Sequence, residues 1–257
     1  MCTVVILRRP GHEWPLLLAA NRDEMAGRPW APPARHWQDR EQVVAGRDLL
    51  AGGTWLGLND FGVAAGISNR RDSLDPAPDK RTRGELVLEA LDHGNASDAA
   101  RALAHIDVRA YRPFNMVIVD NRDAFWLRNE DPKADSRAIA GRVEVLEIPP
   151  GISMITALDR NDMRSPRIRT YLPRFQAAKA PDPEAGRWQA WETLMSSRVH
   201  GAKSGPRGAM CVVTETQYGT LSSSLIALPA PNTQGRKPVW RFCAGLPGET
   251  RYEAVAL

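Results

Sequence analysis

The sequence predicts a layered α+β domain whose strands are largely antiparallel. Apolar, β-branched runs bounded by turn residues come in three blocks, and pairs of helical segments separate these blocks. This order favours layers of sheet and helix over alternating βαβ units. The chain has 257 residues, of which 43% are hydrophobic and 25% charged, so it can bury a core without disulfide or metal support. No repeat or long linker interrupts it, and we expect one domain over 1–257.

The first block contains two predicted hairpins. Residues 2–7 are apolar and β-branched, and the run 16–20 beyond a Pro-Gly turn is the expected partner strand. That strand is expected to end at the polar cluster Asn21-Arg22-Asp23-Glu24. Residues 26–40, rich in Pro, Trp and Arg, predict an irregular surface segment. The second hairpin is predicted over 52–67, with Ser68-Asn69-Arg70-Arg71 at its end.

The rest of the chain alternates between helical and strand patterns. Apolar residues at helical spacing predict helices over 84–93, 97–106, about 164–179 and 186–198. Short apolar runs predict strands at 114–119, 124–127, 143–148, 152–157, 210–214, 221–228 and 238–243.

Charge and composition narrow the possible partners. The chain has 34 basic and 30 acidic residues, a formal charge of +4, and no nucleic-acid-binding signature. Its densest basic group predicts a solvated helix face or loop, with an anion site as the alternative: Arg160, Arg164, Arg167, Arg169 and Arg174. No apolar run reaches transmembrane length. Three widely spaced cysteines indicate a reducing, cytoplasmic location, and five histidines without ligand spacing predict no metal site.

Cys2 is the position with the most distinctive chemistry. Removal of Met1 would leave a thiol and a free α-amine on one residue. The amine has a pKa of roughly 7.7–8.0 and can serve as general base, and the thiol is an intrinsically good nucleophile. The alternative is that Cys2 is a small, inert residue at the start of a strand.

Polar residues at strand ends are candidates to support Cys2. The end of the second strand lies near the start of the first in a hairpin, so we expect Arg22 and Asp23 to approach Cys2. A guanidinium favours a thiolate, and a carboxylate orients an amine. Asn69 can donate to a developing oxyanion. A salt-bridged hairpin end and a turn asparagine are the alternatives.

These residues belong to an ordered set of motifs that resembles a known family. The set comprises Met1-Cys2, Asn21-Arg22-Asp23-Glu24, Gly52-Gly53-Thr54-Trp55-Leu56-Gly57, Gly66-Ile67-Ser68-Asn69, Thr82-Arg83-Gly84, Phe114-Asn115 and Tyr218-Gly219-Thr220 with Ser222-Ser223. It resembles the NRDE family, also called the Transport and Golgi organisation 2 family. That family is similar in turn to N-terminal-nucleophile (Ntn) hydrolases of the choloylglycine hydrolase and penicillin V acylase type.

The resemblance implies a fold, a chemistry and a site. The fold is a four-layer αββα sandwich with largely antiparallel sheets. The reaction is hydrolysis of a C–N amide, or of an ester or thioester, through an acyl-Cys2 intermediate. Its implied catalytic residues are Cys2, Arg22, Asp23 and Asn69, with Asn161 as a candidate second oxyanion donor, and its implied substrate-binding residues are Asn21, Trp55 and Arg70.

Two departures from the family pattern favour keeping a second hypothesis. Leu221 stands where the family often has arginine, and the segment 157–161 matches a family Leu-Ser-Asn core poorly. The alternative function is a non-catalytic protein that binds or traffics haem, lipids or acyl-CoA on the same fold. No cofactor is expected for the hydrolase; under the alternative, haem is the ligand, with Cys2 or a histidine as its axial group.

Overall fold

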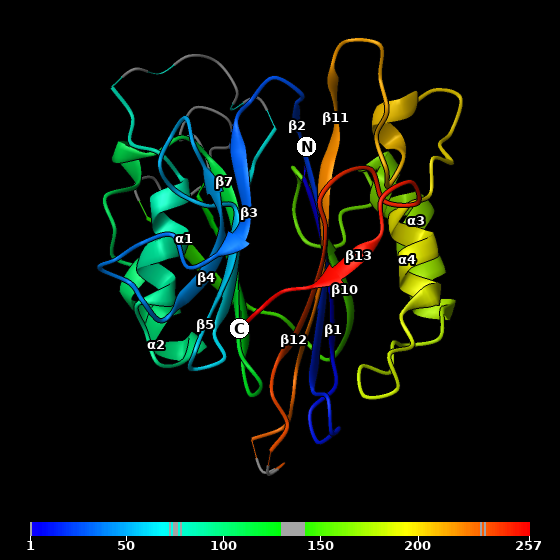
Figure 1. Ribbon diagram of the computed structural model, residues 1–257. Helices are drawn as coiled ribbons and strands as arrows, with labels where there is room; N and C mark the ends of the chain where they lie inside the picture. Colours follow the sequence, from blue (N-terminus) through cyan, green and yellow to red (C-terminus); the bar gives the residue numbers. More distant parts are fainter. Residues whose placement is uncertain are drawn as a thin grey trace. The chain divides into compact units, whose positions relative to one another are not determined.

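The computed structural model describes residues 2–71, 73, 77, 79–129, 142–231, 233 and 235–257. The chain forms two compact units, Met1–Arg28 with Pro149–Leu257, and Pro29–Ile148. The second unit is therefore inserted into the first, whose two segments are far apart in sequence. Each unit consists of an antiparallel sheet and a pair of helices (Figure 1). The prediction of one domain over the whole chain stays a prediction.

The sheet of the first unit has the two N-terminal strands near its centre. Its strand order is β10-β1-β2-β11-β12-β13, and every neighbouring pair is antiparallel. The strand bounds are β1 Thr3–Arg8, β2 Leu16–Met25, β10 Gly151–Ile155, β11 Tyr218–Leu228, β12 Val239–Cys243 and β13 Tyr252–Ala254. Because β1 and β2 each have two neighbours, the N-terminal hairpin organises the whole sheet.

One face of this sheet is covered by helices α3 (Pro166–Ala177) and α4 (Gln189–Met195), as Figure 1 shows. The Ser165 side chain caps α3 by accepting from the Ile168 amide, and Pro166 occupies the first turn, where no amide hydrogen is needed. Apolar side chains from both helices and from the facing strand positions form one core: Val5, Leu17, Ala19, Met154, Ile168, Tyr171, Leu172, Phe175, Trp188, Trp191, Met195, Leu225 and Ala227 among them.

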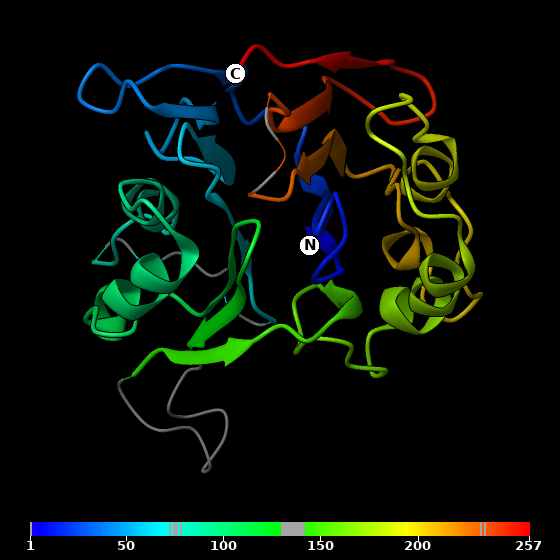
Figure 2. The same cartoon turned by 90° about the horizontal axis from the view of Figure 1, so that it is seen from below.

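The second unit has a seven-stranded sheet of order β3-β4-β5-β6-β7-β8-β9. The bounds are β3 Trp30–Ala34, β4 Val43–Asp48, β5 Leu56–Asn59, β6 Ala64–Asn69, β7 Phe114–Val119, β8 Ala124–Asn129 and β9 Glu144–Glu147. Helices α1 (Gly84–Leu91) and α2 (Ala96–Leu103) lie side by side on one face (Figure 2). Short 3-10 turns occur at Val108–Ala110 in this unit and Pro206–Gly208 in the first.

The N-terminal hairpin differs from its prediction in one important way. The strand expected to end at residue 20 continues to Met25, so Arg22 and Asp23 lie within β2 rather than after it. The β1–β2 pairing stops at Thr3 opposite Asn21, and beyond that point β2 pairs with β11, with Asp23 opposite Thr220. A polar run thus stays in the sheet because a strand distant in sequence supplies its hydrogen bonds.

Two other predictions were wrong, and two strands were missed. Residues 26–40 contain strand β3, and β4 and β13 were not expected. Residues 210–214 form only an isolated bridge, Val213 with Gly219, instead of a strand. The remaining strands and helices were placed within a few residues of their observed bounds, the usual uncertainty at element ends.

Within the part of the chain that the structure describes, no helix is both long and apolar enough to cross a membrane.

Candidate active site

Cys2 lies immediately before β1 in the first unit and is half-buried. Its Sγ donates a hydrogen bond to the main-chain oxygen of Asp23, 3.8 Å away. The register of Thr3 opposite Asn21, continued by one residue, brings Cys2 opposite Arg22. The prediction that Arg22 and Asp23 approach Cys2 therefore agrees with the geometry, although the residues do so from within a strand.

Side-chain alternation separates the site into two faces. Asn21 and Asp23 share a face of β2 with Leu17 and Ala19, which pack against the helices. Arg22 points to the opposite face, and by the same alternation along β1, so does the Cys2 thiol. The Asp23 carboxylate therefore does not meet the thiol directly; the contact is made through its main-chain carbonyl.

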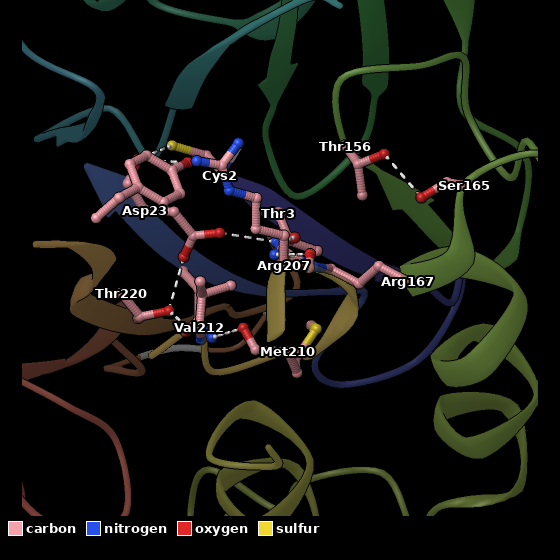
Figure 3. Close-up of polar contacts among 12 residues, drawn as sticks. Cys2, Thr3, Asp23, Thr156, Ser165, Arg167, Arg207, Met210, Val212 and Thr220 are labelled. Atoms are coloured by element: carbon pink, nitrogen blue, oxygen red, sulfur yellow. Dashed lines mark hydrogen bonds and ion pairs between the residues drawn. The ribbon is translucent and has the colours of Figure 1, made fainter. Parts of the chain in front are cut away.

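The Asp23 carboxylate is fully buried and has partners on both oxygens. Oδ2 pairs with Arg167 Nη1 at 2.9 Å, and Oδ1 accepts from Thr220 Oγ1 at 2.7 Å. Thr220 Oγ1 in turn accepts from the Val212 amide at 2.8 Å. Figure 3 shows this network beside Cys2. The carboxylate is thus fixed by side chains from α3 and β11.

Arg167 is the functional candidate that the sequence analysis missed. It was assigned to a solvated basic group, but its side chain is 4% exposed and points at the sheet. Nη1 also donates to the hydroxyl of Thr3, and Nη2 donates to the carbonyl of Arg207 at 3.0 Å. The one available signal was its position four residues before the buried Tyr171, on the apolar side of the helix. Arg164, Arg169 and Arg174 are exposed, as predicted.

The environment of Cys2 favours the thiol form. Burial raises its pKa, the Asp23 charge raises it further, and the nearby Arg22 guanidinium opposes them by lowering it. A base close to the thiol is therefore needed before Cys2 becomes a nucleophile. Met1, whose removal would free the α-amine of Cys2, lies outside the described residues.

Two predicted asparagines in the first unit have clear local contacts. Asn21 is buried, and its Nδ2 donates to the carbonyls of Met195 and Met210 at 3.0 and 2.9 Å, which ties β2 to the end of α4. Asn161 has a left-handed backbone with φ of 57°, and its Oδ1 accepts from the Met154 amide at 2.7 Å. Among the described contacts, none joins Asn161 to Cys2.

The other three predicted residues lie in the second unit. Asn69 ends β6, as expected, and is half-buried. Arg70 Nη1 donates to Asn115 Oδ1 at 2.6 Å, and Trp126 Nε1 donates to the same oxygen at 3.1 Å. Trp55 packs edge-on against Trp30, with ring centroids 5.8 Å apart, and its carbonyl accepts from the amide of Ile67, three residues before Arg70. Their roles in catalysis and substrate binding stay predictions.

No group of three or more His, Cys, Asp or Glu side chains in the described ranges is placed to hold a metal ion.

Comparison with known proteins places the chain in a family. A family model described as Transport and Golgi organisation 2 matches residues 1–233. The mouse Transport and Golgi organization 2 homolog is 36% identical over 110 residues, which are 41% of this chain and 38% of that protein. The human homolog is 34% identical over 110 residues, with the same coverage. The chain thus matches well under half the length of these curated relatives.

Solved structures share the fold at low sequence identity. An N-acylethanolamine-hydrolyzing acid amidase ortholog from Caenorhabditis elegans has a TM-score of 0.55 and 13% identity, over 90% of this chain and 94% of that one. A mutant conjugated bile acid hydrolase from Clostridium perfringens has a TM-score of 0.55 and 10% identity, over 100% and 92%. These likenesses confirm the predicted fold class, an α+β fold of Ntn-hydrolase type.

Proposed function

This chain belongs to the Transport and Golgi organisation 2 family, and we propose that it is a cysteine N-terminal-nucleophile hydrolase of C–N amide bonds. The resemblance that its N-terminal motifs indicated is thereby confirmed at the level of family and fold. Activity, substrate and mechanism are our proposal. Ester and thioester bonds are chemically related substrates, because their carbonyl carbons accept the same nucleophile.

The proposed reaction has two steps. After removal of Met1, the α-amine of Cys2 takes the thiol proton and Sγ attacks the substrate carbonyl, forming a C–S bond. The C–N bond then breaks, and the leaving amine receives the proton from the α-ammonium. In the second step, water adds to the acyl-Cys2 carbonyl and gives up a proton to the α-amine, releasing the acid and restoring the thiol.

One observation carries this proposal: Cys2 stands at the head of a central strand, held from two sides. Its thiol contacts the Asp23 carbonyl and lies near the charge of Arg22. Burial alone would keep the thiol protonated, so formation of the thiolate requires a nearby base. The α-amine of the same residue is such a base. A cysteine serving only as a small strand-starting residue has no need for these polar neighbours.

The supporting residues receive distinct proposed roles. Arg22 stabilises the thiolate by its charge, and Asp23 orients the α-amine of Cys2. Asn69, with Asn161 as the second candidate, donates a hydrogen bond to the oxyanion of the tetrahedral intermediate. Asn21, Trp55 and Arg70 remain candidates for substrate binding. Three free cysteines, two of them buried, support our proposal that the protein works in the reducing cytoplasm.

The first test is mass spectrometry of the N-terminal peptide after brief exposure to iodoacetamide. We expect a chain that begins at Cys2 and a Cys2 that is alkylated well ahead of the buried Cys211 and Cys243. The same preparation is then screened for hydrolysis of a panel of N-acyl amides. Turnover by the processed protein, lost in Cys2→Ala, supports the proposal.

The control is a form that retains Met1. Its Cys2 has no α-amine, so it should neither turn over amides nor label rapidly. Equal turnover by the Met1-retaining form contradicts the Ntn mechanism. An inert Cys2 in the processed protein contradicts it too, and non-catalytic binding of haem or acyl chains then becomes the hypothesis to test.

A further inference from the structure

We propose that Arg167 is a positioning residue for Cys2, acting through Asp23 and Thr3 from the helix-covered face of the sheet. This inference rests on the proposed function of the same site. Arg167 does not touch the thiol, so its role is to neutralise the Asp23 carboxylate and to hold the residues beside Cys2.

The guanidinium of Arg167 contacts residues on both strands beside Cys2. A single nitrogen, Nη1, bonds both Asp23 Oδ2 and the Thr3 hydroxyl. Thr3 directly follows Cys2, and the Asp23 main-chain oxygen accepts from the Cys2 thiol. Figure 3 shows Arg167 reaching these residues from α3. One side chain therefore contacts both the first residue of β1 and the β2 residue whose carbonyl meets the Cys2 thiol.

Arg167 and Asp23 form a buried ion pair. The side chains of Arg167 and Asp23 are 4% and 0% exposed, so each charge is stable there only because the other is present. Thr220 donates to the other oxygen of Asp23, and Arg167 Nη2 donates to the Arg207 carbonyl. An apolar side chain of similar length would fill the same space without the desolvation penalty of a buried charge. A buried arginine at this position therefore indicates a need for a positive charge that also donates hydrogen bonds.

Arg167 also offsets the electrostatic effect of Asp23 on Cys2. The charge of Asp23 raises the pKa of the Cys2 thiol. Arg167 lies against that carboxylate and reduces its effect on the thiol. Without Arg167, Asp23 either remains an uncompensated anion, which opposes thiolate formation, or takes up a proton and can no longer orient the amine of Cys2 as an anion. Both outcomes weaken the nucleophile.

The test measures iodoacetamide alkylation of Cys2 against pH in the processed protein. Arg167→Met removes charge and donors, and Arg167→Lys keeps the charge but has one nitrogen in place of the fork. Arg169→Met, on the exposed side of the same helix, is the matched control. We expect Arg167→Met to slow Cys2 alkylation at pH 8 by at least about threefold, with its pH profile moved to higher pH. Arg167→Lys should recover most of the rate, and Arg169→Met should match the wild type.

A double variant separates positioning from general loosening of the fold. If Arg167 acts through Asp23, Arg167→Met should change the Cys2 rate little in an Asp23→Asn background. Additive effects of the two changes, or an Arg167→Met profile equal to wild type, overturn the proposal. Circular dichroism checks each variant for folding, and Arg167→Gln, which removes the charge but keeps an amide donor, serves if Arg167→Met does not fold.

Alkylation does not require turnover, so the two proposals fail separately. A protein that hydrolyses no amide but shows this dependence of Cys2 reactivity on Arg167 contradicts the hydrolase alone. Amide turnover with kcat unchanged in Arg167→Lys and Arg167→Met contradicts the positioning role alone.

Discussion

At the scale of single residues, the region behind Cys2 depends on buried polar contacts. Asp23, Arg167 and Thr220 come from three separate elements and satisfy one another away from solvent. Such a network stabilises the fold most when every member is paired. A buried polar group that loses its partner keeps the full desolvation penalty without the compensating hydrogen bond. Changes at its outer members therefore provide sensitive tests of the geometry.

Thr220→Val should destabilise the first unit by about 1–3 kcal/mol, because valine has the same shape but no hydroxyl. The change leaves one oxygen of Asp23 and the Val212 amide without the partners they have now. Urea unfolding followed by tryptophan fluorescence measures the loss. Thr220→Ser keeps the hydroxyl and is the control; equal stability of the valine and serine variants would show that the network is unimportant.

Cys243 provides a pH prediction. It is fully buried between the carbonyls of Gly245 and Thr250, and burial raises its pKa to about 11. The folded state favours the neutral thiol, so its contribution to stability is present below the ordinary thiol pKa and is lost as pH rises through the folded pKa. The free energy of unfolding should therefore fall by about 2 kcal/mol between pH 9 and 11 on account of this group.

Chemical denaturation across that pH range measures this decrease, with Cys243→Ala as the comparison. The alanine variant should show a shallower decrease, since it cannot ionise. Parallel pH profiles for the two proteins would mean that Cys243 does not contribute in this way.

At the scale of elements, backbone packing explains two glycines of the family motifs, Gly53 and Gly84. A Cβ atom added at Gly53 would lie 2.5 Å from the carbonyl carbon of Gly84, at the first residue of α1. The Thr54 amide also donates to the Gly84 carbonyl. Close approach of two backbone segments therefore accounts for these two glycines.

Gly53→Ala should destabilise the second unit by about 2 kcal/mol or more, because backbone rather than a flexible side chain must move. Gly94→Ala is the control, since an added Cβ there meets no atom within 4 Å. Thermal unfolding of both variants, followed by far-ultraviolet circular dichroism, measures the difference. Equal midpoints would refute the close approach.

At the scale of the whole molecule, the insertion of the second unit has a consequence for folding. The first unit needs both Met1–Arg28 and Pro149–Leu257, and β1 and β2 join β10 to β11 in its sheet. These contacts join segments that are remote in sequence. Forming them requires a large loss of chain entropy, which local contacts do not offset.

A chain lacking residues 1–28 should lose the sheet of its first unit while its second unit retains structure. Hydrogen exchange by mass spectrometry should show full exchange over β10, β11 and β12 and continued protection of α1 and β7. Deleting 252–257, which removes only the edge strand β13, is the control and should leave β11 protected. Persistent protection of β11 in the first deletion would contradict the central role of the hairpin.

The sequence by itself determined the fold class, most of the strands and all four helices, and it singled out Cys2 as the centre of the candidate site. These features depend on local periodicity, turn residues and an ordered set of motifs, all of which a single chain displays. The N-terminal hairpin was also recoverable, because its two strands are close in sequence and joined by a recognisable turn.

Only the tertiary structure decided what lies against the hairpin. The continuation of β2 through Asp23 depends on β11, which is almost two hundred residues away, and the burial of Arg167 depends on which side of α3 faces the sheet. Pairing between strands distant in sequence and burial of a charged side chain are both properties of the packed molecule. The sequence around Arg167 resembles an exposed basic group and does not reveal that this side chain is buried. The sequence thus singled out Cys2 as the candidate nucleophile, and packing supplied the partners that hold its neighbours.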